Sequence, residues 1–226
     1  MTVAWRAMRM GEDALLLRLG DAIDADANAR VHALAARIGA TRPSWLRDIV
    51  PAYASLALFV DADAFPDGDD PLARAETWLR ALPPGDADST ASRAKSHDIG
   101  VRYGGESGPD LEAVAEHAGL QPRQLVERHA AAEYRVAMLG FAPGFPYLLG
   151  LDPRLAMPRL PTPRLRVEAG SVGIGGAQAG IYPHPGPGGW RIIGRTDALL
   201  FDPARDPPSL LAPGDRVRFV PTGRLP

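Results

Sequence analysis

The spacing of apolar residues in the first part of the chain predicts a mixture of helices and strands. Between residues 26 and 38, Val31, Leu34 and Ile38 recur at helical spacing, and Gly39 is placed to end that helix. Three more helices are predicted over 71–82, 110–118 and 121–131. Strands are predicted over 14–19, 48–50, 55–60, 97–103 and 134–139.

From residue 140 onward the pattern changes, because glycine and proline become frequent. They supply 29 of the 87 residues there, against 18 of the first 139. A region so rich in these residues cannot be helical. Short apolar pieces between the turns predict strands over 167–174, 178–182, 190–195, 198–201 and 216–221. This pattern is typical of a compact β-barrel or sandwich with long ordered loops.

These two patterns predict an α+β protein of two domains. The small, polar stretch 83–95 is the expected linker between an α/β domain over 1–88 and a β domain over 96–226. Apolar runs such as 56–60 are far shorter than the roughly 20 residues of a membrane span. No signal-peptide pattern opens the chain, so we expect a cytoplasmic protein. The absence of cysteine excludes disulfides, cysteine-ligated metals and a cysteine nucleophile.

Charge is unevenly distributed along the chain. Residues 1–139 carry 15 basic and 21 acidic side chains, whereas residues 140–226 carry 10 and 6, a balance of +4. Anionic ligands are therefore expected on the second part. Lys95 is the only lysine, and no glycine-rich motif surrounds it, so the lysine-containing phosphate loop is absent. A bound phosphate would need arginine, backbone amides or a partner chain.

Three segments of the second part carry candidate chemistry. The apolar loop 140–148 can form a ligand-binding wall or a structural corner. Arginines among the prolines of 154–166 can face an anion or line a solvated loop. We expect 170–176 to form a backbone nest for an anion. A nucleophile elbow is disfavoured there, because Ala169 replaces its first glycine and no helix follows.

The five histidines show no metal-ligand spacing, so no metal site is expected. His32 and His117 are expected on helix surfaces. His129, at a helix end, and His184, in a proline–glycine loop, are the candidates for a catalytic role.

Ordered motifs run through the chain, including VRYGGESGPDL from Val101, GFAPGFPYL from Gly140, AGSVGI from Ala169, QAGIY from Gln178 and PGGW from Pro187. With them the chain resembles, over nearly its whole length, the KipI-like family. That family includes the B subunit of bacterial ATP-dependent 5-oxoprolinase, also labelled allophanate hydrolase subunit 1. The resemblance implies a cyclophilin-like C-terminal barrel and two partners, a homologous C subunit and a separate A subunit. It implies opening of the lactam of 5-oxo-L-proline to L-glutamate, with ATP, as its magnesium complex, cleaved to ADP and phosphate.

The resemblance also implies a set of candidate site residues. The expected catalytic residues are His129 and Glu106. The expected substrate- and anion-binding residues are Arg164, Gly170, Ser171, Gln178, Tyr182 and Arg195. The chain departs from the usual family pattern at Glu168, Ala179 and Gly186, where proline, threonine and serine are usual. Two alternatives remain open: an interaction protein that inhibits a sensor histidine kinase, and a protein related to allophanate hydrolase or urea amidolyase.

Overall fold

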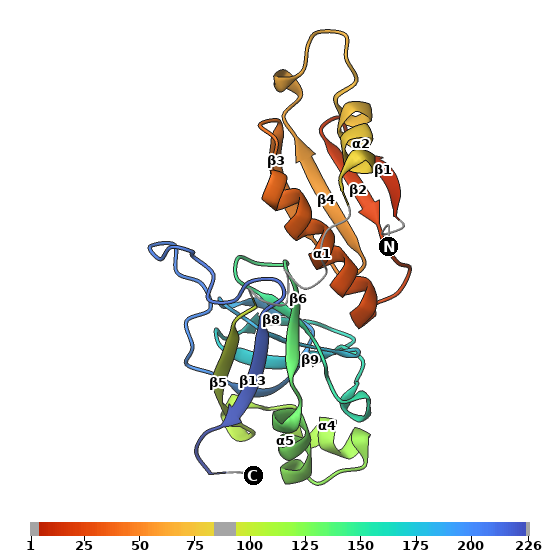
Figure 1. The fold of residues 1–226 in the computed structure, drawn as a ribbon. Coiled ribbons are helices and arrows are strands. Elements are labelled where there is room, and N and C mark those ends of the chain that lie inside the picture. The colour runs from red at the N-terminus through yellow and green to blue at the C-terminus, as the bar shows by residue number, and fades with distance from the viewer. Residues whose placement is uncertain (1–4, 84–93, 225–226) are drawn as a thin grey trace. The chain divides into compact units, whose positions relative to one another are not determined.

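The computed structural model describes residues 5–83 and 94–224, which divide into two units at Ala94 and Lys95 (Figure 1). Each unit has its own apolar core. Most of the expected linker, residues 84–93, lies outside the described residues.

Within residues 5–83, the N-terminal unit is an antiparallel sheet with two helices on one face. Its strand order is β1-β2-β4-β3. The strands are β1 (Arg6–Met10), β2 (Ala14–Arg18), β3 (Leu46–Pro51) and β4 (Ser55–Val60), and the helices are α1 (Ala25–Thr41) and α2 (Pro71–Ala81). Leucines from β2 and β4 pack against both helices, and this apolar layer is the core of the unit.

Side-chain caps begin both helices of this unit. Asp24 accepts hydrogen bonds from two amides of the first turn of α1, and Asp70 does the same for α2. The prediction that Gly39 ends α1 is wrong. The helix continues to Thr41, because the amide of Arg42 still bonds to the carbonyl of Ile38.

The C-terminal unit is a closed barrel, as expected. Among the described residues its strand order is β10-β7-β6-β13-β5-β12-β9, with β5 and β13 parallel and the other pairs antiparallel. The strands are β5 (Ser96–Tyr103), β6 (Tyr134–Leu139), β7 (Pro146–Leu149), β9 (Ser171–Gly175), β10 (Gln178–Ile181), β12 (Arg191–Arg195) and β13 (Arg216–Pro221). Helices α4 (Leu111–Ala118) and α5 (Pro122–Ala131) lie side by side at one end of the barrel (Figure 1).

Two of the strand predictions for the C-terminal unit are wrong. The run 167–174 is split, because β8 (Arg164–Val167) pairs with β11 (Gly186–Gly188) outside the barrel, while β9 lies within it. Gly170 makes the turn between them at φ +79, where a Cβ atom would overlap the carbonyl oxygen of Thr196. The run 198–201 forms no strand and makes only an isolated bridge at Phe201.

No helix within the described residues is both long and apolar enough to cross a membrane. The same residues contain no group of three or more histidine or carboxylate side chains placed to hold a metal ion.

Candidate functional site

Three glycines form a flat floor on the outer wall of the barrel. In β9 and β10, Val172, Ile174, Ala179 and Ile181 point into the barrel core, so the alternate positions point outward. The outward positions include Gly173, Gly175 and Gly180. A Cβ atom on Gly175 would lie 2.5 Å from the indole of Trp190, and one on Gly180 would lie 2.9 Å from the ring of Phe145. The glycines are therefore required for rings to lie directly on the sheet.

The rings above this floor form an aromatic face, which we define as Phe141, Phe145, Tyr147, Tyr182 and Trp190. Their centroids are 4.9–6.2 Å apart in edge-to-face arrangements, a favourable geometry for aromatic pairs. Burial raises the pKa of Tyr182, so its hydroxyl stays neutral. The loop 140–148 contributes Phe141, Phe145 and Tyr147 to this aromatic face, and part of the loop is strand β7.

One end of the aromatic face is polar. Gln178 pairs in register with Gly175, so its side chain lies on the same face as the indole of Trp190. Gln178 is only 9% exposed, and no protein group within the described residues hydrogen-bonds to its carboxamide. The guanidinium of Arg159 lies 5.5 Å from the indole centroid, and no described carboxylate pairs with it. The indole of Trp190 therefore has an amide and a cation among its neighbours.

The other end of the aromatic face contains a strained, exposed ring. Phe141 is 65% exposed and contacts Phe145 and Tyr182. Its φ of 66° lies in the left-handed region, which a bulky residue rarely adopts. Backbone strain of this kind persists only where the surroundings impose it, and it is concentrated at functional sites.

Arg164 is held by Asp110, which also fixes the start of β12. One carboxylate oxygen of Asp110 lies 2.7 Å from Nη2 of Arg164, and the other accepts the amide of Ile192 at 2.6 Å. Arg164 also donates to the carbonyl of Trp190. Its charge is thus neutralised within the protein, and its main contribution is to position Trp190.

The expected backbone nest at 170–176 does not form. The amides of Gly170 and Gly176 donate to the carbonyls of Tyr182 and Met157, and residues 171–175 belong to the barrel as β9. Ser171 lies opposite Arg195 in the sheet, and Arg195 donates to the carbonyl of Ala169. Because these amides are already paired in the folded barrel, they are not available to an anion.

Of the two expected catalytic residues, His129 lies in the barrel core and Glu106 on the surface. The imidazole of His129 is fully buried, stacks on Phe219 and has Nδ1 2.8 Å from the hydroxyl of Tyr103. Burial lowers the pKa of His129 to about 3. Neither residue lies in the aromatic face. His32, expected on a surface, is only 7% exposed.

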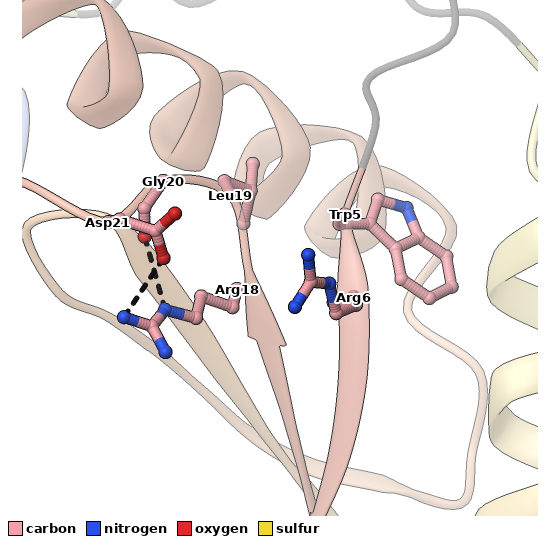
Figure 2. A pocket seen from close by; sticks show the side chains of 6 residues that line it. All are labelled: Trp5, Arg6, Arg18, Leu19, Gly20 and Asp21. Atoms are coloured by element: carbon pink, nitrogen blue, oxygen red, sulfur yellow. Dashed lines mark hydrogen bonds and ion pairs between the residues drawn. The ribbon is translucent and has the colours of Figure 1, made fainter.

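Two clefts lie away from the aromatic face. The first, of about 250 Å³, lies in the N-terminal unit and is lined by residues that include Arg6, Arg18 and Asp21 (Figure 2). The second, of about 320 Å³, borders α5 near Gln124 and Arg128. Neither contains an expected site residue.

The fold, a helix-covered sheet joined to a closed barrel, has known counterparts. The model of the family described as "Carboxyltransferase domain, subdomain C and D" matches residues 5–211, and the chain belongs to this family. Two similar proteins are B subunits of 5-oxoprolinase. That of Bacillus subtilis is 40% identical over 97% of this chain and 94% of that protein, and that of Escherichia coli O157:H7 is 42% identical over 96% and 95%.

Solved structures agree with this assignment. The crystal structure of TTHA0988 superposes with a TM-score of 0.78 at 41% identity, covering 94% of this chain. This chain spans only 41% of that one. The crystal structure of a conserved uncharacterized protein, PH0987 from Pyrococcus horikoshii, superposes with a TM-score of 0.57 at 43% identity, covering 97% of this chain and 98% of that one.

Sequence patterns do not single out three residues of this site. Trp190 belongs to the PGGW motif, which assigns it no role. Arg159 is one of the arginines of 154–166 that the sequence allows to face an anion, but nothing distinguishes it from the others. Asp110 carries only the signal of a helix start. Its side chain instead bonds to partners 54 and 82 residues away.

Proposed function

We propose that this chain is the B subunit of an ATP-dependent 5-oxoprolinase, an enzyme that hydrolyses 5-oxo-L-proline to L-glutamate with ATP cleaved to ADP and phosphate. The observation that carries this proposal is the identity of 40 and 42%, over nearly the full length, to two proteins of that name. The urea amidolyase of Saccharomyces cerevisiae is 32% identical over only half of this chain, which favours a shared fold over a shared reaction.

The polar end of the aromatic face is suited to the substrate of this reaction. 5-Oxoproline is a five-membered lactam with a carboxylate, and its ring N–H and C=O point to the same side. The free carboxamide of Gln178 can donate to that C=O and accept from that N–H. Arg159 can pair with the carboxylate, and the indole of Trp190 can cover the ring methylenes. The buried Tyr182 holds the rings behind this end in place.

The remaining expected site residues have other roles in this proposal. His129 is sealed in the core, so it has no path for proton exchange with substrate, and we assign it to stability. Glu106 is exposed and has no partner among the described residues, so it can take part in a site that a second protein completes. Ser171 and Arg195 belong to the barrel wall, Gly170 makes the turn before β9, and Arg164 is held by Asp110 outside the barrel.

A nucleotide fits this chain poorly. The glycine amides of 170–176 are paired, Arg164 is neutralised by Asp110, and the sequence has no lysine phosphate loop. We therefore place ATP and its magnesium ion mainly on the partner A and C subunits, and place the complex in the cytoplasm, where ATP is available. Transfer of the γ-phosphoryl group of ATP to the lactam oxygen, with ADP as the leaving group, would make the ring carbon electrophilic. Water would then add to that carbon, the ring C–N bond would break, and the resulting acyl phosphate would hydrolyse to glutamate and phosphate.

The test is reconstitution with the purified A and C subunits. We expect the chain alone to be inactive and the mixture to release glutamate and ADP. Gln178→Ala should raise KM for 5-oxoproline roughly 10-fold to 100-fold, because it removes two hydrogen bonds to the lactam. Arg123→Ala is the matched control, since Arg123 is exposed and pairs only with Glu127 among the described residues.

Two results would contradict the proposal separately. Robust ATP-dependent turnover by the single chain would refute the need for partners. An unchanged KM in a folded Gln178→Ala complex would remove Gln178 from the substrate site.

A further inference from the structure

The N-terminal sheet has a second face that no element of residues 5–83 covers. Ala7, Leu15 and Leu17 point toward the helices, so their neighbours along β1 and β2 point away from them. The strand registers place these outward side chains in two rows across the sheet. One row is Met8, Leu16, Ala57 and Val50, and the other is Met10, Ala14, Phe59 and Asp48. We call these eight residues the open face.

Seven of the eight residues of the open face are apolar, and several are well exposed. Met8 is 49% exposed, Met10 42% and Val50 39%, while Leu16 and Phe59 are half-buried. Isolated surface hydrophobics are ordinary, but a contiguous apolar patch with a polar rim is typical of a protein–protein contact. The open face therefore has the composition of an interface core.

Two arginines stand at one end of the open face. Arg6 and Arg18 are directly opposite each other on β1 and β2, an arrangement that is destabilising for like charges. Arg18 forms an ion pair with Asp21 at 3.0 Å, but no carboxylate within the described residues pairs with Arg6. Both arginines line the cleft of Figure 2, where Arg6 lies apart from the Arg18–Asp21 pair. A carboxylate entering this cleft would relieve the repulsion.

About a two-fold axis that runs along or across the strands, a second copy of this chain does not supply that carboxylate. If two open faces pack about a two-fold axis parallel to the strands, Asp48 of one copy lies over Met10 of the other. If the axis runs across the strands, Arg6 and Arg18 lie over the row of Met10 and Ala14. Both arrangements bury a charge against apolar side chains, which is costly.

We propose that the open face docks a different protein, whose contact surface is apolar and ends in an aspartate or glutamate that binds Arg6 and Arg18. This inference rests on the proposed function, in which the chain works as one component of a complex. It assigns the N-terminal unit to assembly, while the barrel carries the candidate substrate site.

The test measures binding of the purified C subunit by titration calorimetry. A double variant, Met8→Lys with Met10→Lys, and the charge reversal Arg6→Glu should each weaken binding at least about tenfold. The controls are Ala40→Lys on α1 and Arg74→Glu on α2, which lie on the helices that cover the other face and should bind like wild type. Circular dichroism checks that every variant is folded, and added salt should weaken wild-type binding more than Arg6→Glu binding.

The outcomes separate this inference from the proposed function. If wild type fails to bind the C subunit, the proposed complex and this interface both fall. If wild type binds and the double methionine variant and Arg6→Glu both bind equally well, only the interface is refuted. If sedimentation shows wild-type dimers that the methionine variant abolishes while the C subunit still binds it, the face is a homodimer contact and the inference is overturned.

Discussion

Gly175 lies beneath the indole of Trp190, and a methyl group at this position would collide with it. An added Cβ atom would lie 2.5–2.7 Å from three ring atoms, whereas ordinary contact begins near 3.4 Å. Gly175→Ala must therefore move the indole by about 1 Å in a well-packed cluster, because Trp190 also contacts Phe145 and Tyr147. Overpacking of this size costs about 1–3 kcal/mol.

The assay for Gly175→Ala is calorimetric melting of the full chain, with near-ultraviolet circular dichroism to report ring packing. Each kcal/mol lost from the free energy of unfolding should lower the Tm of the barrel transition by roughly 3–6 °C. Gly186→Ala is the matched control, because Gly186 is also a strand glycine and a Cβ atom there meets nothing within 4 Å. If both variants melt at the same temperature with wild-type aromatic spectra, the glycine floor does not support the indole as we argue.

Three further outcomes are expected. Asp110→Ala should lower the free energy of unfolding, measured by chemical denaturation, by about 2–3 kcal/mol. The loss should exceed that of Arg164→Ala, because Asp110→Ala also leaves the amide of Ile192 without its acceptor, and equal losses would contradict this. Burial depresses the pKa of His129 in the folded state, so the unfolded chain binds more protons between about pH 6.5 and 3. Stability should therefore fall as pH decreases through that window, and a folded His129→Gln should show a shallower slope in pH-dependent melting. Phe141→Gly should keep or raise the Tm, because glycine adopts the left-handed φ without strain, and it should lower the turnover of the reconstituted complex. A lowered Tm with normal turnover would refute the strain argument.

Much of the local structure follows from sequence patterns. The strands 55–60, 134–139 and 216–221 coincide with β4, β6 and β13, because their apolar runs are bounded by turn-forming residues. The pattern does not predict strand β1, since it is an edge strand in which only Ala7 is half-buried and no alternation is visible. Strand β7 is hidden in a proline- and glycine-rich loop.

The candidate site is predictable only in part. The motifs around Gln178 and Tyr182 point to residues that the barrel does bring to its aromatic face. The nest at 170–176 is a reasonable expectation from glycine content, but glycine also serves where a ring lies flat on a sheet. Sequence composition cannot distinguish these two uses, because the difference lies in what occupies the space above the backbone.

The sequence by itself determined the α+β class, the helix starts, the glycine-rich barrel and the family, because these depend on local periodicity, capping residues and ordered motifs. Tertiary structure alone decided which groups remain available for chemistry. Closure of the barrel paired the amides of 170–176, buried His129 and neutralised Arg164 with Asp110, while it left the amide of Gln178 beside Trp190 without a protein partner among the described residues. The physical reason is that hydrogen bonds and burial are satisfied between residues far apart in the chain, and their spacing in sequence does not record those contacts.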